Sequence, residues 1–333
     1  MKLLLTLDYE LFLGSHTGTV DNCLIRPLDS YLEAVDSYGV HFTIFVDAAY
    51  LYALDRQKNR FVTLNDDYEK IKNHLQRLHK GGHDIQLHIH PQWFYSEFDG
   101  REWHLDTKHY KLVDIPHLDC FRLVKESKSI LDNMIDKSTK VFRAGGFSAQ
   151  PTAILTDMFD RCGLKVDSSV CPGECYKSDY QRYDYRDVLK KINYRFDDNI
   201  CEEEEDGRFM EVPLSMYSIS PVFHWKLAAI RLLEKFSKHT LHDTYGDGQS
   251  IHATRTSIVH RLIHSSNTMA TIDGYKISFL KDAIAKYDKS GYDIMCILGH
   301  PKLATPYSVR KMRDLCEYAK QMGHEFYTMT EVI

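Results

Sequence analysis

Two histidines stand one residue apart at the end of an apolar run, in Ile85-Gln86-Leu87-His88-Ile89-His90. In a β-strand, residues i and i+2 point to the same side of the sheet, so both imidazoles can face one point in space. Imidazole nitrogens are ligands that zinc and similar divalent ions accept readily. The stretch therefore predicts a metal site with His88 and His90 as two of its ligands.

Two carboxylates show the same spacing after the first apolar run of the chain. Asp8 and Glu10 follow Leu3-Leu4-Leu5-Thr6-Leu7. Carboxylates at the end of a buried strand are costly unless they are paired or bind a metal. A strand that simply emerges into solvent would explain the pair equally well in isolation. The histidine pair in a matching position favours a shared site.

Three further polar residues follow apolar strand-like runs. Arg143 lies in Phe142-Arg143-Ala144-Gly145-Gly146-Phe147, Asp167 follows Leu164-Lys165-Val166, and His300 follows the run that ends in Leu298-Gly299. An arginine beside Asp8 would keep that carboxylate ionised and oriented. We therefore expect five strand ends to meet around one site.

Short apolar strands alternate with helical patterns through most of the chain, which is typical of parallel βαβ units. This alternation predicts an α/β fold, a distorted TIM-like (β/α) barrel of about seven parallel strands, whose chemistry lies at the carboxyl ends of the strands. The predicted strands are 2–8, 41–46, 84–89, 140–143, 164–167, 209–213, 293–298 and 324–329. The predicted helices include 27–38, 66–80, 118–135, 277–289 and 306–322.

The segment from about 171 to 275 does not follow this alternation. Residues 171–208 are rich in Tyr, Asp, Lys and Arg, and residues 222–275 have a polar, His-rich pattern that we interpret as mostly helical. We expect a single domain, 1–333, with about 171–275 as an irregular and helical insertion within it.

Composition excludes several classes of function. A net charge of -5 and a pI near 6.4 argue against nucleic-acid binding, which usually needs a basic face. No apolar run approaches the length of a membrane span. The apolar start is broken by Asp8 before a signal-peptide core is complete, which favours a cytoplasmic protein with free cysteines. Nothing in the sequence predicts the oligomeric state.

Taken in order, these motifs resemble those of the polysaccharide deacetylases of the NodB-homology type. The matching stretches are Thr6-Leu7-Asp8-Tyr9-Glu10, Gly82-His83-Asp84-Ile85-Gln86-Leu87-His88, Phe142-Arg143-Ala144-Gly145-Gly146-Phe147, Val166-Asp167-Ser168-Ser169 and Leu298-Gly299-His300.

The chain departs from the family pattern at three places, which indicates a divergent bacterial branch. Tyr9 separates the two acids, the family's tryptophan after Asp167 is absent, and Gln92 stands where the second metal histidine is usual. The second histidine ligand is therefore carried over to His90, and whether His90 or Gln92 completes the metal shell stays open.

The resemblance implies a metal-dependent hydrolase that removes an acetyl group from an N-acetylated sugar, either a polysaccharide or its precursor, as in surface polysaccharide biosynthesis. It implies one divalent ion, with zinc favoured, and a carbohydrate partner. The implied ligands are Glu10, His88 and His90. The implied catalytic roles are base for Asp8, its orientation for Arg143, acid for His300 and orientation of that acid for Asp167, with Trp93 and Phe147 contacting the sugar.

Three alternatives remain open at the level of sequence. One is a deformylase or other amide hydrolase acting on a lipid- or nucleotide-linked amino sugar. Another is a carbohydrate-binding protein without catalysis, which the Gln92 departure motivates. A third is an additional metal site at His260 and His264, whose spacing places them on one helix face. An exposed helix face explains that last pair better, because no acid accompanies it.

Overall fold

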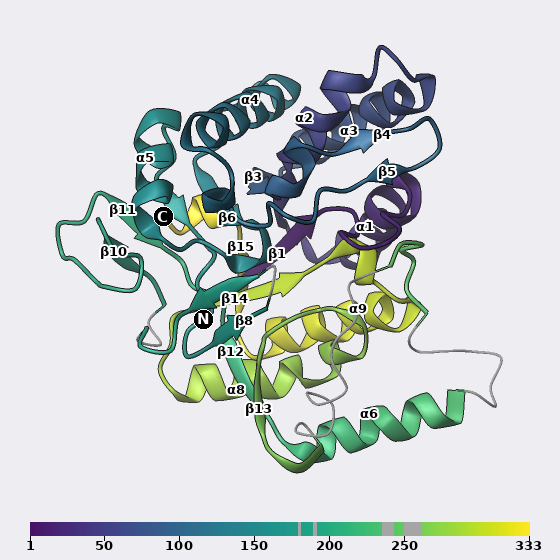
Figure 1. Ribbon diagram of the computed structural model, residues 1–333. Coiled ribbons are helices and arrows are strands. Elements are labelled where there is room, and N and C mark those ends of the chain that lie inside the picture. The colour runs from purple at the N-terminus through teal and green to yellow at the C-terminus, as the bar shows by residue number, and fades with distance from the viewer. Residues whose placement is uncertain (179–180, 189–191, 235–242, 250–261) are drawn as a thin grey trace. The chain divides into compact units, whose positions relative to one another are not determined.

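The computed structural model describes residues 1–178, 181–188, 192–234, 243–249 and 262–333 (Figure 1). The chain divides into two compact units. The larger unit contains residues 4–10, 41–214 and 327–333, and the smaller one contains residues 1–3, 11–40 and 215–326. The boundary between the two units falls after residue 214, inside the expected insertion. A single domain with one insertion stays a prediction.

A parallel sheet forms the centre of the larger unit. Its strands run in the order β10-β11-β7-β6-β3-β2-β1, and every neighbouring pair is parallel except β10 and β11. The strands are β1 (Lys2–Tyr9), β2 (Thr43–Asp47), β3 (Asp84–Ile89), β6 (Val141–Ala144), β7 (Val166–Asp167), β10 (Tyr194–Phe196) and β11 (Phe209–Glu211).

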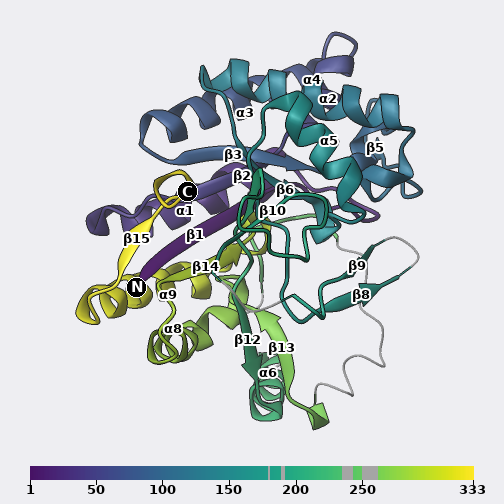
Figure 2. The same cartoon turned by 90° about the vertical axis from the view of Figure 1, so that its left-hand side faces the viewer.

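The strands β2, β3 and β6 are buried along their whole length, as parallel strands covered on both faces should be. Their connecting helices gather on one side of the sheet in Figures 1 and 2, each touching the next. These are α2 (Ala48–Gln57), α3 (Val62–Lys80), α4 (His117–Ile135) and α5 (Thr152–Cys162). The register aligns Asp47, His88 and Arg143 on three neighbouring strands, so their side chains start from one row.

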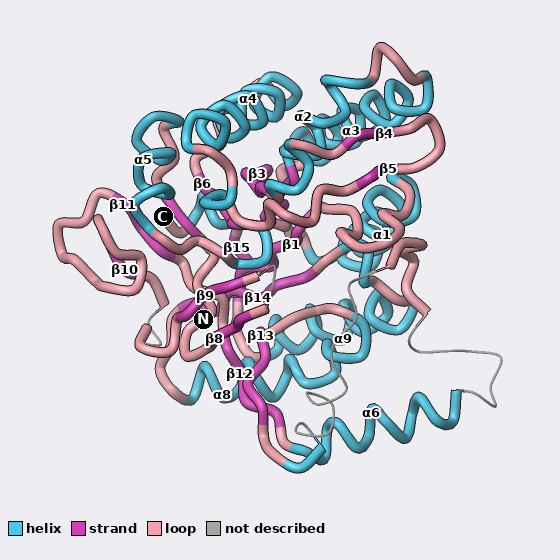
Figure 3. The backbone as a smooth tube through the Cα atoms, viewed as in Figure 1, coloured by secondary structure: helices cyan, strands magenta, loops and turns pink. Residues whose placement is uncertain are grey.

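Two small hairpins complete the larger unit, and Figure 3 shows them within long loops. They are β4 (Glu97–Phe98) with β5 (Trp103–His104), and β8 (Cys175–Lys177) with β9 (Arg182–Asp184).

The smaller unit combines helices with an antiparallel strand pair, β12 (Met216–Ile219) and β13 (Ser266–Met269). Residues 270–272 leave β13 and run parallel to β14 (Ile294–Gly299), because Leu298 bonds through its main chain to Ala270 and Ile272. The remaining elements are α1 (Arg26–Val35), α6 (Pro221–Glu234), α8 (Leu280–Lys289), α9 (Pro306–Gln321) and β15 (Glu325–Tyr327), whose last residue belongs to the larger unit.

The predicted α/β class and (β/α) architecture are confirmed, with each predicted strand present within a few residues. The mostly helical interpretation of 222–275 is wrong at β13, where Ser266–Met269 pairs with β12. That strand has no apolar alternation, and its pairing with Met216–Ile219 overrides the local preference. Helix α2 was not predicted from the sequence. Among the described residues, no helix is both long and apolar enough to cross a membrane.

Candidate metal centre

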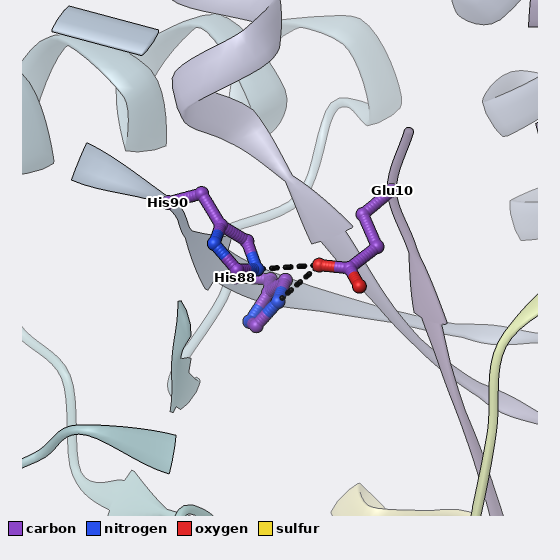
Figure 4. A group of neighbouring side chains, drawn as sticks. All are labelled: Glu10, His88 and His90. Atoms are coloured by element: carbon purple, nitrogen blue, oxygen red, sulfur yellow. Dashed lines mark hydrogen bonds and ion pairs between the residues drawn. The ribbon is translucent and has the colours of Figure 1, made fainter. Parts of the chain in front are cut away.

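Strand β3 and the exit of β1 bring Glu10, His88 and His90 together in the larger unit (Figure 4). The Oε2 atom of Glu10 lies 3.0 Å from Nε2 of His88 and 2.5 Å from Nε2 of His90. All three side chains are buried. Figure 4 shows both imidazole rings pointing at the same carboxylate oxygen. Three ligand atoms that converge on one point in this way form a candidate site for one cation.

The hydrogen bond made by Nδ1 of His88 fixes which ring nitrogen carries the proton. Nδ1 lies 2.7 Å from the carbonyl oxygen of Arg143, and only a protonated nitrogen can donate there. In neutral His88, Nε2 then carries a lone pair that faces the negative oxygen of Glu10. This contact is repulsive unless a proton or a metal cation lies between them, and such a second partner is the usual support of a metal-bound histidine.

The electrostatic surroundings of His88 also favour a cation. Burial disfavours the charged imidazolium, but attraction from Asp8 and the contact with Glu10 outweigh it and raise the pKa of His88 to about 9. The residues present therefore fit a divalent ion: two imidazoles and a carboxylate in a buried, negative pocket. They leave the remaining coordination positions of such an ion to water or substrate.

His90 is held by its backbone and by close packing. Its main-chain N–H donates to Oδ1 of Asp47 over 3.2 Å. A Cβ atom on Gly145 would lie 2.7 Å from Nδ1 of His90 and 2.6 Å from the carbonyl oxygen of Ile89, so only glycine fits there. Among the described residues, the buried Nδ1 of His90 has no hydrogen-bond partner. Nε2 of His90 lies in the cluster beside Glu10. The buried Oε1 of Gln92 has no hydrogen-bond partner among the described residues, and His90 as the residue that completes the metal shell stays a prediction.

Arg143 contacts both His88, through its carbonyl oxygen, and Asp8, through its guanidinium. Its guanidinium is fully buried, donates to Oδ1 of Asp8 over 2.6 Å and lies 3.9 Å above the ring of Phe45. Further donors reach Thr6 and the carbonyl and hydroxyl oxygens of Ser168. A buried charge with this many partners is fixed in place, so Arg143 holds the carboxylate of Asp8 in one orientation.

Asp167 is fully buried and accepts from the main chain and the hydroxyl of Ser169, whose hydroxyl in turn accepts from the N–H of Ala144. Glu211 lies opposite Asp167 in the strand register and accepts from the N–H of Val170. Burial raises the pKa of Asp167 to about 6, while its hydrogen bond with Glu211 opposes that rise. The two carboxyl groups therefore form a pair that retains a proton to higher pH than a single carboxyl group.

His300 belongs to the smaller unit and pairs there with Asp273. Its main-chain N–H and its Nδ1 donate to the two carboxylate oxygens over 2.7 and 2.8 Å. Burial alone would raise the pKa of Asp273, but His300 more than offsets this and the pKa is lowered. The carboxylate that orients His300 is thus Asp273, whereas Asp167, expected in that role, bonds to Ser169.

The two expected sugar-contacting residues differ in position. Trp93 is completely buried, donates from Nε1 to Asp47 and packs against Tyr50 and Trp103, so its ring offers no surface to a ligand. Its role in this structure is to hold Asp47 behind His90. Phe147 is half-buried and has a positive φ of 59°, an uncommon conformation for an aromatic residue. His260 lies outside the described residues.

Sequence reasoning missed Asp47, Glu211 and Asp273. Asp47 directly follows the strand predicted at 41–46. Asp8 was chosen because it follows an apolar strand, and the same criterion would have found Asp47. Glu211 lies inside the apolar run Phe209-Met210-Glu211-Val212. An acid in such a run indicates a buried carboxyl group that needs a partner. Asp273 follows residues expected to be helical, and no strand-end signal marked it.

Comparison with known proteins gives structural matches. A provisionally assigned polysaccharide deacetylase from Mycobacterium smegmatis matches with a TM-score of 0.52 at 15% identity, over 99% of this chain and 88% of that one. A polysaccharide deacetylase from Bacillus cereus matches with a TM-score of 0.42 at 12% identity, over 98% and 91%. A family 4 carbohydrate esterase from Streptomyces lividans, in complex with acetate, matches with 0.42 at 11%, over 98% and 92%.

No family model and no curated sequence matches the chain. The match to the Mycobacterium smegmatis protein extends over almost the whole chain, so the fold is that of a polysaccharide deacetylase of the NodB type. The resemblance inferred from five short motifs is confirmed in the fold, at an identity low enough to fit a divergent branch.

Proposed function

We propose that this protein is a metal-dependent carbohydrate N-deacetylase that hydrolyses the acetamide of an N-acetylated sugar, in a polysaccharide or its precursor. The observation that carries the proposal is the convergence of Glu10, His88 and His90 beside the buried Asp8–Arg143 pair. Zinc suits two imidazoles and a carboxylate, although other transition metals accept the same donors.

The proposed chemistry divides between ligands and proton carriers. A divalent ion held by the three ligands would polarise the amide carbonyl and acidify a water molecule. Asp8, oriented by Arg143, accepts the proton of the attacking water as general base. The family resemblance assigns to His300 the role of acid toward the departing amine. Within the smaller unit, Asp273 fixes the tautomer of His300 through Nδ1, so that Nε2 can carry a proton to donate.

The decisive variant is Asp8→Asn, because Asp8 is proposed as base and not as ligand. The variant should keep about one divalent ion per chain and lose acetate release from an N-acetylglucosamine oligomer by at least about 100-fold. Asp99→Asn, at an exposed carboxylate that also meets a histidine, is the matched control and should keep full activity. Full activity of Asp8→Asn with bound metal would exclude Asp8 as the base.

The same assay distinguishes the deformylase alternative. Acetate and formate are measured side by side on N-acetyl and N-formyl amino sugars, free and lipid-linked. Preferential release of formate would replace deacetylation by deformylation at the same site. Absence of either product from a metal-loaded protein that still binds the sugar would favour the non-catalytic alternative.

A further inference from the structure

Tyr110 lies beside the candidate metal centre in the larger unit, on the long connection that leaves the carboxyl end of β3. Its ring meets the ring of His90 edge to face, with 6.5 Å between the ring centroids and 87° between the ring planes. Loops that follow the carboxyl ends of parallel strands commonly carry substrate-binding residues in (β/α) folds. Tyr110 thus borders one of the proposed metal ligands from such a loop.

Contacts at both ends of Tyr110 hold it in this position. Its main-chain N–H donates to Oδ2 of Asp114 over 3.1 Å. At the other end, a Cβ atom on Gly146 would lie 2.7 Å from the Tyr110 hydroxyl oxygen, and Gly146 has a φ of 57°. The preceding residue, Gly145, is the glycine that packs against His90. The hydroxyl therefore lies on the same glycine turn that supports a proposed ligand.

Packing explains the ring of Tyr110 but not its hydroxyl. A phenylalanine would fill the same space, and a polar atom on a half-buried side chain usually has a hydrogen-bond partner. In the part of the chain that the structure describes, no group forms a hydrogen bond with this hydroxyl. The phenol proton is thus available to a ligand bound at the metal centre.

The hydroxyl of Tyr110 is a hydrogen-bond donor at neutral pH. A tyrosine is protonated there in any case, and burial and then the negative charge of Glu10 raise the pKa of Tyr110 further. The oxygen and nitrogen atoms of Glu10, His88 and His90 that would hold a cation have no hydrogen to donate. Tyr110 therefore supplies a kind of group that the three ligand atoms lack.

We propose that Tyr110 is a substrate-contacting residue of the metal centre and that its hydroxyl donates a hydrogen bond to the oxygen of the substrate's acetyl group. The proposal rests on the proposed function, because it concerns the same site and the same amide. A donor at that oxygen stabilises the negative charge that develops there during hydrolysis. Tyr110 lies outside the five motifs of the family resemblance, so that resemblance does not imply this contact.

The test variant is Tyr110→Phe in the full-length, metal-loaded protein, because it removes the hydroxyl and keeps the ring. Its metal content should equal that of the wild type, whereas kcat/KM for acetate release from an N-acetylglucosamine oligomer should fall by at least about ten-fold. The matched control is Tyr95→Phe, on the same connection with a side chain that is 40% exposed, and it should behave as the wild type. Wild-type kcat/KM in Tyr110→Phe, or an equal fall in both variants, overturns the proposal.

A binding measurement separates this contact from the proposed function. Acetate is titrated into the cobalt-loaded proteins, and its binding is followed by the change in the visible absorption of the ion. Tyr110→Phe should weaken acetate binding by about ten-fold or more, because a hydrogen bond to a charged group is lost, while Tyr95→Phe should not. That result supports the contact even if no N-acetylated sugar is hydrolysed, in which case only the proposed function fails. Equal acetate affinity in the wild type and Tyr110→Phe overturns the contact even if the wild type is a deacetylase.

Discussion

Among the described residues of the larger unit, two clusters of acids and histidines bring three possible ligand atoms together, and they differ in burial. Glu10, His88 and His90 are buried, whereas Asp99, Glu102 and His104 are exposed on the β4–β5 hairpin. In the exposed cluster, Asp99 accepts from the N–H groups of Arg101 and Glu102 and meets His104 at 2.9 Å. The backbone N–H of Glu102 and then His104 lower the pKa of Asp99.

The difference lies in how the acceptor atoms are used. Asp99 closes a turn, so its oxygens already have donors and water can solvate the rest. Glu10 instead faces two imidazole nitrogens in a place from which water is largely excluded, and one of these nitrogens belongs to a ring whose proton is committed to a carbonyl oxygen. Both clusters contain acids and histidine at short distances. Burial and the fixed tautomer of His88 distinguish the candidate metal centre from the surface turn.

The largest effect is expected when one histidine is removed from each cluster. His88→Ala should reduce the bound divalent ion from about one per chain to near zero and lower deacetylation by more than about 100-fold, because even indirect supports of a metal ligand are worth about 10- to 100-fold. His104→Ala should change neither quantity. Elemental analysis of the dialysed proteins and an acetate assay measure both. Equal metal content in the two variants would contradict the assignment.

A second contrast concerns buried and exposed arginine pairs. Arg143→Ala leaves Asp8 buried without its partner and should lower the free energy of unfolding by about 3–5 kcal/mol. Replacing Arg208, which pairs with Asp160 and Asp197 at the surface, by Ala should lower the free energy of unfolding far less, because water screens the pair. Urea denaturation of both variants measures the difference, and similar losses would show that Arg143 is not a buried anchor.

A smaller effect is expected from adding one methyl group behind His90. Gly145→Ala should cost about 1–3 kcal/mol of stability through overpacking against Ile89 and His90, and it should weaken metal binding. Gly163→Ala is the control: it introduces a side chain at a φ of 70° in open space, at about 1–2 kcal/mol. Calorimetric titration with zinc should show weaker binding in Gly145→Ala alone. Unchanged affinity there would mean that His90 is not a ligand.

The last expected effect is a pH dependence. The pKa of Asp167 is about 6 in the folded protein and near 3.9 in an unfolded chain. The folded state therefore binds more protons between these values, and this group makes stability fall as pH rises from about 4 to 6. Asp167→Asn should flatten that part of the stability curve. Unfolding midpoints measured across this range test it, and an unchanged slope would show that the Asp167–Glu211 pair does not hold the proton.

Much of the fold follows from local signals. Strands β1, β2 and β14 are mostly apolar, and β3 alternates Ile85, Leu87 and Ile89 with polar residues. The candidate site residues chosen from the sequence lie at or just after the ends of these strands. The acids and histidines of the candidate centre could be chosen because a polar residue after a buried strand is costly without a partner.

What could not be predicted depends on contacts between distant segments. Strand β13 exists through its pairing with β12, and Asp273 reaches His300 only because residues 270–272 run beside β14. Trp93 looked like a ligand-facing aromatic, but its burial behind His90 is decided by Tyr50 and Trp103. Local sequence patterns do not predict such contacts between distant segments.

Arg143 contacts the proposed base Asp8 with its side chain and the proposed ligand His88 with its main chain. Its guanidinium holds Asp8, while its carbonyl oxygen holds the ring of His88. The first contact depends on the side chain, whereas the second exists for any amino acid that keeps β6 in place. Mutation at position 143 can therefore disable the base without disturbing the ligand. Under the proposed function, one such substitution removes the base and leaves the three proposed metal ligands in place.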